Sequence, residues 1–390
     1  MTLEPGAKVL ITGGTGHLGG ALVRALIRKR GLRPADLRVF YLAGAPPGDF
    51  GDVPGLEFAP EDVLDRESVR RACRGMDVIF HLAASTSFDP RQKSAQWRIN
   101  VEGTRNVLDA ALESRSVRRV VYTSTVNVLA APHPPGSIGD INVCNPYAGS
   151  KRLHSFHSRE EILEFVETAR RGTRGWERRI GIGYFDSKLA AQELVGQYVV
   201  ERGLDIVSVL PGTLFGPYDA LVGSGIFLLA IYNRKMPGVL KGGISTVHVM
   251  DAAEGLILAM EKGRTGGRYI LTGPPENNLH FRELAVIITE VLRRRFPERR
   301  FRRRYPVYPV WAATSAAWFS DMAARLFGRP CLISRDVVRA GSRALFYSPD
   351  LAARKLGYRP RRSFREAVEE MADDYKARGL FNSLLGISRT

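Results

Sequence analysis

The sequence predicts an α/β protein, with a doubly wound parallel sheet followed by a smaller, mainly helical lobe. Three observations lead to this fold class. Short apolar runs alternate with segments of helical spacing through the first half of the chain, as repeated βαβ units require. A glycine-rich turn directly follows the first apolar run. Beyond about residue 212 the alternation fades, so we expect a sheet domain over 1–215 and a second lobe over 216–390.

The apolar runs of the first half are short enough to be buried strands. We expect strands at Lys8–Thr12, Leu37–Leu42, Asp77–Leu82, Arg119–Ser124 and Asp205–Leu210, with another strand-like run at Leu56–Phe58. Helical spacing occurs at Leu18–Arg30, Asn100–Leu112 and Lys188–Glu201. Right-handed crossovers then place helices on both faces of the sheet.

The second lobe shows helical segments and little alternation. We expect helices near Gly225–Asn233, Asp251–Glu261 and Phe281–Arg295, and one strand at Tyr269–Thr272. No flexible linker precedes this lobe, so it is expected to pack on the sheet.

Composition narrows the class of protein. The chain has 390 residues, of which 44% are hydrophobic, and this excludes a disordered or fibrous protein. The three cysteines are far apart and odd in number, so neither a disulfide framework nor a zinc site is expected. The same cysteine spacing leads us to expect no metal site. We expect a cytoplasmic protein, because the chain has no signal-like start and no apolar run of ~20 residues.

The charge balance is strongly basic, with 57 Lys and Arg against 40 Asp and Glu. Such an excess favours anionic ligands or membrane surfaces, or it reflects only an arginine-rich proteome. No recognition helix, zinc finger or RNA-stacking motif accompanies it, so specific nucleic-acid binding is not expected.

The glycine-rich turn suits a dinucleotide. It contains Gly13, Gly16 and Gly19 in the spacing GxxGxxG, with Thr15, His17 and Leu18 between them. Glycine allows the tight turn and lets the backbone approach a pyrophosphate, while the following helix offers free N–H groups. The sequence therefore predicts a Rossmann-like cofactor site.

Other strand ends are candidates for cofactor contacts. Asp62 and Val63 could meet an adenine edge. The third strand ends in Leu82, Ala83 and Ala84, which leave room for a dinucleotide. The fifth strand ends in Pro211 and Gly212. The alternative is that these are ordinary strand ends. Asn100 either caps its helix or holds a proton-relay water.

The choice between NAD and NADP is open. Val39–Gly44 ends the second strand without an acid for the ribose of NAD or an arginine for the 2′-phosphate of NADP. His17 and the basic excess favour NADP slightly.

A tyrosine and a lysine four residues apart are the candidate acid/base pair. Tyr184 and Lys188 share a helix face, where an ammonium would lower the pKa of the phenol. Tyr147 and Lys151 have the same spacing but no strand follows them, so we expect Tyr147 to be structural or at the pocket rim.

Two hydroxyls end the fourth strand. Ser124 and Thr125 are placed to polarise a carbonyl, and the alternative is that they cap the strand end.

Together these motifs resemble the extended short-chain dehydrogenase/reductase superfamily. The similarity extends to Asn100–Thr104, Pro211–Pro217 and Val247–Asp251, and Phe346–Pro360 resembles its 3β-hydroxysteroid dehydrogenase and dihydroflavonol reductase branch. The resemblance implies an NAD(P)-dependent enzyme with Tyr184 as acid/base, Lys188 as its helper and the hydroxyl role on Thr125.

The expected reaction is hydride transfer between nicotinamide and a secondary alcohol or ketone. The expected substrate is hydrophobic, for example steroid-, terpenoid- or polyketide-like. The alternatives are a nucleotide-sugar epimerase or dehydratase and a non-catalytic NAD(P)-binding sensor or scaffold. Ser124–Val126 contains no acid for a dehydratase, and an intact tyrosine–lysine pair argues against a sensor.

One stretch departs from the family pattern. Tyr184 lies 59 positions after Thr125, which is longer than the family spacing. We expect an insertion over about 150–180 that serves as a lid, a partner surface or a decorated loop.

A basic segment is followed by an apolar one. Residues 293–304 hold eight arginines, and residues 305–320 carry no charge. This pattern favours peripheral contact with the inner membrane face, or a solvated basic strand before a helix over the pocket. A homodimer is also compatible with the sequence.

Overall fold

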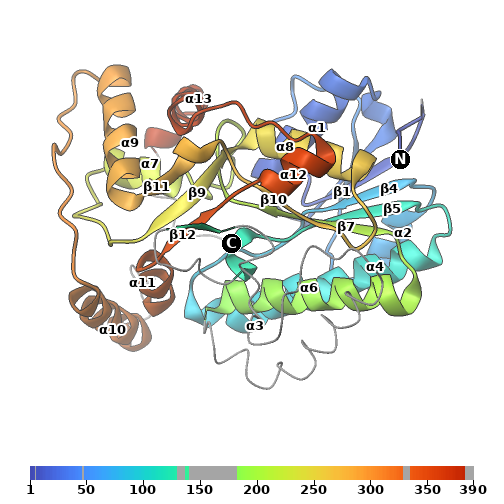
Figure 1. The fold of residues 1–390 in the computed structure, drawn as a ribbon, viewed down its shortest axis with the longest axis horizontal. Coiled ribbons are helices and arrows are strands. Elements are labelled where there is room, and N and C mark those ends of the chain that lie inside the picture. The colour runs from blue at the N-terminus through green and yellow to red at the C-terminus, as the bar shows by residue number, and fades with distance from the viewer. Residues whose placement is uncertain (5, 46–47, 130–136, 140–181, 328–333, 383–390) are drawn as a thin grey trace.

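A computed structural model describes residues 1–4, 6–45, 48–129, 137–139, 182–327 and 334–382 (Figure 1). Its main sheet has seven strands in the order β10-β7-β5-β4-β1-β2-β3, and every neighbouring pair is parallel. The strands are β1 (Val9–Thr12), β2 (Leu37–Tyr41), β3 (Glu57–Pro60), β4 (Val78–His81), β5 (Arg119–Thr123), β7 (Ile206–Pro211) and β10 (Arg268–Leu271). The predicted parallel sheet is confirmed.

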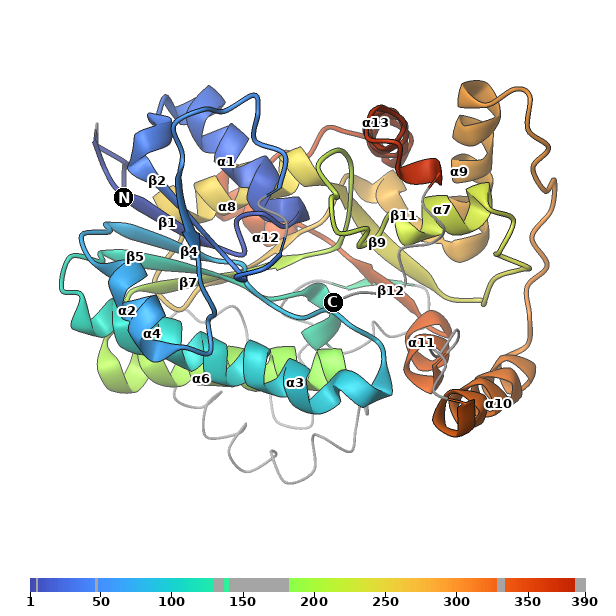
Figure 2. The ribbon, with the colours of Figure 1, turned by 180° about the vertical axis from the view of Figure 1, so that it is seen from behind.

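Helices cover both faces of this sheet (Figures 1 and 2). One layer contains α1 (His17–Arg30), α8 (Val249–Lys262) and α12 (Asp350–Leu356), and the other contains α2 (Arg66–Cys73), α4 (Gly103–Glu113) and α6 (Gly183–Arg202). Each layer shares a buried apolar core with the strands. The fold is therefore doubly wound, as predicted.

The direction of winding fixes where a ligand can lie. From β1 the chain proceeds to β2 and β3 on one side, and then to β4, β5, β7 and β10 on the other. The strand order therefore reverses between β1 and β4. In open parallel sheets a crevice forms at this point, outside the carboxyl ends of the strands.

The second lobe has its own core and a smaller sheet. Its strands are β6 (Ile138–Gly139), β8 (Thr213–Phe215), β9 (Gly243–His248), β11 (Asn278–His280) and β12 (Ala344–Tyr347). The helices around this core are α7 (Ile226–Tyr232), α9 (Phe281–Arg295) and α13 (Phe364–Ala377). The lobe thus contains a small sheet beside the expected helices.

The main sheet extends past residue 215. β10 pairs with β7, and α8 packs against α1. β10 and α8 therefore belong to the main sheet and its helical layer, although they follow β8 and β9 in the chain. The division expected at 215 therefore does not separate the two sheets, because the chain returns to the first one.

The remaining helices lie near the carboxyl ends of the strands. They are α3 (Lys93–Trp97), which continues into a π-helical segment at Arg98–Glu102, and α10 (Val310–Phe327) and α11 (Arg335–Gly341). No helix among the described residues is long and apolar enough to cross a bilayer. The expected insertion at 150–180, with Tyr147 and Lys151, lies outside the described residues.

Candidate active site

The glycine-rich turn joins β1 to α1 at the point where the strand order reverses. The first helical turn has no acidic residue, and its N-cap, Gly16, provides no side-chain acceptor. The N–H groups and the positive end of the helix dipole are thus available to an anion.

The three glycines have different roles. A Cβ on Gly13, whose φ is +69°, would lie 2.8 Å from the nitrogen of Ala83, and one on Gly19 would lie 2.4 Å from the oxygen of Gly13. Both positions therefore need glycine for the turn to pack. A Cβ on Gly16 would meet only the oxygen of Gly13, at 3.2 Å, and otherwise open space. Gly16 thus leaves a cradle beside the helix N-terminus that fits a pyrophosphate.

His17 faces the second lobe rather than the end of β2. Its Nδ1 lies 3.9 Å from Oδ1 of Asp219, and burial lowers the pKa of the imidazole. A neutral histidine in this position does not attract a 2′-phosphate, so the expected contribution of His17 to NADP preference is not supported. Leu18 is buried behind the turn, and Thr15 is largely buried at its edge.

Asp62 and Val63 have local contacts. Oδ1 of Asp62 accepts from the backbone of Leu64 at 2.9 Å, and Val63 is buried against Gly103, where a Cβ would lie 2.9 Å from Cγ2 of the valine. Val63 thus explains why α4 begins with glycine.

The end of β4 lines the other side of the turn. His81 is buried, with ring nitrogens 2.7 Å from Oγ1 of Thr12 and 3.0 Å from Oγ1 of Thr104. Burial lowers the pKa of His81 to about 3, so the ring stays neutral and holds β1, β4 and α4 together. The following residues, Leu82, Ala83 and Ala84, remain partly exposed.

Asn100 does not cap its helix, because it lies inside the π-helical segment whose N-cap is Trp97. Its amide accepts from the backbone of Ser85 at 2.8 Å and donates to the oxygen of Ser85 at 3.0 Å and to Oγ of Ser187 at 2.9 Å. Ser187 in turn donates to the oxygen of Tyr184 at 2.9 Å. Asn100 therefore connects the loop after β4 to the first turn of α6, which carries the tyrosine.

Tyr184 faces the hydroxyl of Thr125. The nearby hydroxyl favours the phenolate, but burial dominates and raises the pKa of Tyr184 to about 12. Thr125 also accepts from the backbone of Asn127 at 3.3 Å, as the N-cap of the short helical turn Val126–Val128 that follows β5. Neighbouring Ser124 is buried, and its Oγ has no partner among the described residues.

Lys188 is held at the end of β5. Its Nζ donates to the oxygen of Thr123 at 2.6 Å and lies 4.7 Å from the ring centre of Tyr122. The pKa of Tyr184 is raised rather than lowered because burial outweighs every other influence on it. Burial also lowers the pKa of Lys188 to about 7.

Aromatic rings form a wall beside the tyrosine. The ring centre of Phe88 lies 6.0 Å from that of Tyr184 and 5.9 Å from that of Phe185. Ser334, the N-cap of α11, donates to the oxygen of Phe88 at 2.9 Å. This wall was not predicted from the sequence, because Phe88 is in a loop without a motif.

Pro211 and Gly212 end β7 at the junction of the two sheets. Gly212 donates to the oxygen of Leu271 at 3.1 Å, and a Cβ there would lie 2.6 Å from the oxygen of Ser245. Gly212 is thus required where β7 meets β9.

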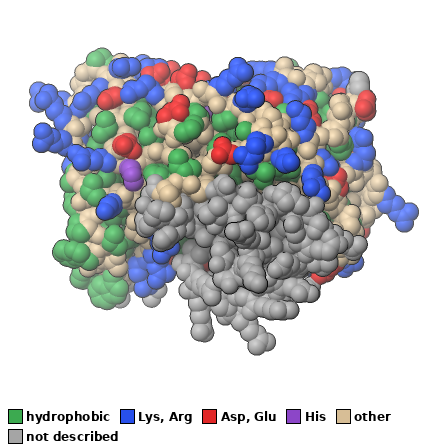
Figure 3. Space-filling model, viewed as in Figure 1, with side chains coloured by type: hydrophobic (Ala, Val, Ile, Leu, Met, Phe, Trp, Pro, Cys, Tyr) green, Lys and Arg blue, Asp and Glu red, His purple; other side chains and the backbone are tan. Residues whose placement is uncertain are grey.

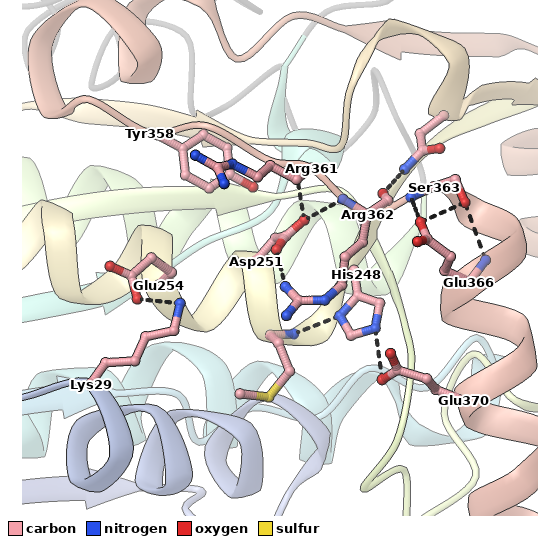
Figure 4. A network of polar contacts seen from close by, with 12 residues as sticks. Lys29, His248, Asp251, Glu254, Tyr358, Arg361, Arg362, Ser363, Glu366 and Glu370 are labelled. Carbon is pink, nitrogen blue, oxygen red and sulfur yellow. Dashed lines mark hydrogen bonds and ion pairs between the residues drawn. The ribbon is translucent and has the colours of Figure 1, made fainter.

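The stretch Val247–Asp251 forms a junction between the lobes (Figure 4). Asp251 accepts from the backbone N–H groups of Arg361 and Arg362, each at 3.0 Å, and from the Arg362 side chain. His248 lies 3.1 Å from the carboxylate of Glu370 on α13. This motif therefore fastens α8 to the C-terminal segment.

The candidate residues thus gather at one edge of the sheet. β1, β4, β5 and β7 all end there, and α6 presents Tyr184 and Lys188 beside Ser124 and Thr125. An open cradle at Gly16, an unpartnered hydroxyl at Ser124 and a tyrosine–threonine pair fit a nicotinamide dinucleotide and a carbonyl substrate.

Known proteins support this assignment. The sequence profile of the 3-beta hydroxysteroid dehydrogenase/isomerase family matches residues 10–138. Sterol demethylase protein B of Methylococcus capsulatus is 31% identical over 272 residues, which cover 68% of this chain and 69% of that protein. The chain belongs to the extended short-chain dehydrogenase/reductase superfamily. It is accordingly an NAD(P)-dependent oxidoreductase that transfers a hydride between nicotinamide and a secondary alcohol or ketone.

Two further known proteins align with nearly the whole chain. A Synechocystis protein proposed to be a dihydroflavonol 4-reductase is 27% identical over 374 residues, covering 95% of this chain and 94% of its own. The crystal structure of UDP-glucose 4-epimerase from Thermotoga maritima superposes with a TM-score of 0.66 at 17% identity, covering 95% of this chain and 99% of the epimerase. At that identity the epimerase supports the fold alone.

Proposed function

We propose that Tyr184 is the proton donor and acceptor of a reductase acting on a hydrophobic ketone or alcohol. The observation that carries the proposal is the position of the Tyr184 phenol beside the hydroxyls of Thr125 and Ser124, at the carboxyl edge of the sheet. It provides one proton donor and one orienting hydroxyl at the same point. Both lie beside the end of β5, one strand from the point where the strand order reverses.

In the proposed reaction, bound nicotinamide supplies or accepts the hydride. Thr125, with Ser124, donates a hydrogen bond to the carbonyl oxygen and orients it toward Tyr184. The phenol then gives its proton to the oxygen, and in the reverse direction the phenolate takes it back. Water is kept away by Phe88 and Phe185, whose rings lie next to that of Tyr184.

Lys188 has an electrostatic role in this proposal. With a pKa of about 7, its amine changes charge near neutral pH. A phenolate forming at Tyr184 would favour the ammonium, so the lysine stabilises the deprotonated tyrosine as the proton leaves. The hydrogen bond to Thr123 holds the amine in place during this change.

The apolar wall supports a hydrophobic substrate. Phe88 and Phe185 offer aromatic surface beside the ring of Tyr184. The sterol demethylase protein B and the dihydroflavonol 4-reductase are named for substrates that contain several rings. We infer a ring-containing ketone or secondary alcohol.

We further propose a modest preference for NADP. Its support is the basic excess of the chain and the lack of an acid at Val39–Gly44, where the ribose of NAD would be held. The ratio of kcat/KM for NADPH and NADH tests it, and a higher value with NADH would contradict it.

The decisive experiment compares two tyrosines. Tyr184→Phe keeps the ring but removes the proton, so turnover should fall by ~10²-fold or more while cofactor still binds. Tyr147→Phe, in the second tyrosine–lysine pair, is the matched control and should lose much less. Turnover is followed by nicotinamide absorbance and cofactor binding by nicotinamide fluorescence. The opposite ranking would move the site to Tyr147.

A further inference from the structure

Helix α10 carries large apolar side chains on its surface. Trp311, Phe319 and Trp318 are 74%, 60% and 50% exposed. We define the α10 patch as Val307, Tyr308, Val310, Trp311, Trp318, Phe319 and Met322, all of them exposed. Figure 3 shows apolar side chains gathered at the lower left, where Figure 1 places α10. Exposed apolar patches of this kind mark a docking surface.

The composition of the patch suits a bilayer interface. Tryptophan and tyrosine combine an apolar ring with a polar group, and they accumulate where lipid meets water. α10 has 18 residues and does not qualify as a membrane span. An apolar helix of this kind fits a position in the plane of the interface.

Three exposed arginines precede α10 in the segment beside the patch. Arg300, Arg303 and Arg304 are exposed, and none has an ion pair or side-chain hydrogen bond among the described residues. They belong to the segment 296–309, which leads into α10 along the same outer edge of the molecule (Figures 1 and 2).

The other arginines of the run are engaged within the protein. Arg299 donates to the hydroxyl of Tyr232 at 2.8 Å, Arg302 to the oxygen of Pro237 at 3.1 Å, and Arg295 to the carboxylate of Asp373 at 3.0 Å. The sequence over residues 296–327 contains only two acidic residues, Glu298 and Asp321. The edge therefore keeps a net positive charge beside its apolar surface.

We propose that the α10 patch, together with Arg300, Arg303 and Arg304, docks this enzyme on an anionic lipid bilayer. Free guanidinium groups complement anionic headgroups, and the aromatic side chains enter the interface behind them. The competing occupant is a second copy of the chain. A two-fold contact would place the same surface on both sides and bring like-charged arginines together, so the charge favours lipid.

Docking would also bring the aromatic wall beside Tyr184 close to the lipid. α10 packs against α11, whose N-cap Ser334 holds the oxygen of Phe88, the residue beside Tyr184. Asp336 of α11 also pairs with Lys93 at 3.1 Å. If the proposed function holds, a ring-containing substrate dissolved in the bilayer would reach the aromatic wall without crossing water.

Vesicle co-sedimentation of the full chain tests the proposal. We expect binding to vesicles of phosphatidylglycerol and phosphatidylcholine at about 0.01 M salt, and its loss at about 1 M salt or on pure phosphatidylcholine. The triple variant R300Q/R303Q/R304Q should bind ~100-fold more weakly at low salt. The matched control R74Q/R115Q/R202Q removes three exposed arginines at the ends of α2, α4 and α6, across the molecule from α10, and should bind like the wild type.

A second variant tests the aromatic part. W311Q/W318Q/F319Q changes side chains that are already exposed, so it should fold and bind NAD(P)H normally but show no blue shift of tryptophan emission with vesicles. Leu221→Gln, at a residue 61% exposed elsewhere, is its control. No binding of the wild type at low salt would overturn the proposal. Equal binding by the arginine triple variant and its control would also overturn it. A wild-type dimer that becomes a monomer in the aromatic variant would overturn it as well. None of these readouts depends on turnover, so Tyr184 could fail its own test independently.

Discussion

The tyrosine site and the α10 edge are built in opposite ways. Tyr184 and Lys188 are held by β5, and Asn100 and Ser187 connect their helix to the loop after β4. α10 packs mainly against α11, and of its described side chains only that of Ala317 is buried. Proton transfer needs groups fixed before the substrate arrives, whereas docking needs side chains left uncovered. Substitutions at the first region should therefore change chemistry and stability, and those at the second should change neither.

The largest effect should come from Lys188→Met. Without the amine the tyrosine loses its electrostatic support, so turnover should fall by ~10²-fold or more. The substitution should also stabilise the fold below pH 7. The pKa of Lys188 falls from 10.5 to about 7 on folding, so at low pH the native state keeps a charge that burial disfavours.

The pH profile makes this prediction specific. For the wild type, the free energy of unfolding should rise between pH 7 and about 10.5, because the unfolded lysine binds the extra proton there. The gain in Tm of Lys188→Met should therefore be largest below pH 7 and vanish toward pH 10.5. A constant gain at every pH would show that the amine is not buried as described.

Two glycine substitutions should separate cofactor binding from folding. Gly16→Val fills the open cradle and should weaken NAD(P)H binding by about 10-fold or more, with a smaller loss of Tm than Gly19→Ala. Gly19→Ala forces a Cβ to within 2.4 Å of the oxygen of Gly13 and should instead lower the stability of the protein by about 1–3 kcal/mol. Fluorescence titration and thermal unfolding measure the two effects. Equal loss of Tm in both variants would contradict the division.

The junction at Asp251 should have an intermediate effect on stability alone. Asp251→Asn removes a carboxylate that accepts from two backbone N–H groups and from Arg362, and should cost about 1–3 kcal/mol. The control Glu370→Gln changes a half-exposed partner of His248 and should cost less than about 1 kcal/mol. Urea unfolding measures both, and a larger loss in the control would reverse their assigned importance.

The smallest effect is expected on the α10 edge. Trp318→Gln should change the free energy of unfolding by less than about 0.5 kcal/mol and leave turnover of a water-soluble ketone unchanged. A large loss of stability in the absence of lipid would mean that this tryptophan is part of the folded core. The contrast between the two regions would then disappear.

The sequence predicted local features well and long-range ones poorly. The first strand, the glycine turn and α1 were expected almost residue by residue, because apolar spacing and glycine act locally. The link from Asn100 to Ser187 joins residues 87 positions apart, and no pattern in either segment indicates it. The raised pKa of Tyr184 depends on burial, which the spacing to Lys188 does not reveal.

The late return of β10 to the main sheet has a consequence for synthesis. β7 ends at Pro211, and its outer neighbour β10 begins only at Arg268, after β8 and β9 of the second sheet. At about 5–20 residues per second a ribosome needs roughly 3–11 s to make the intervening chain. During that interval the edge of β7 has no partner strand, and an unpaired edge can join another chain. The nascent protein therefore presents an unpaired sheet edge even after its nucleotide-binding half has been made, and a chaperone that shields β7 would act in this interval.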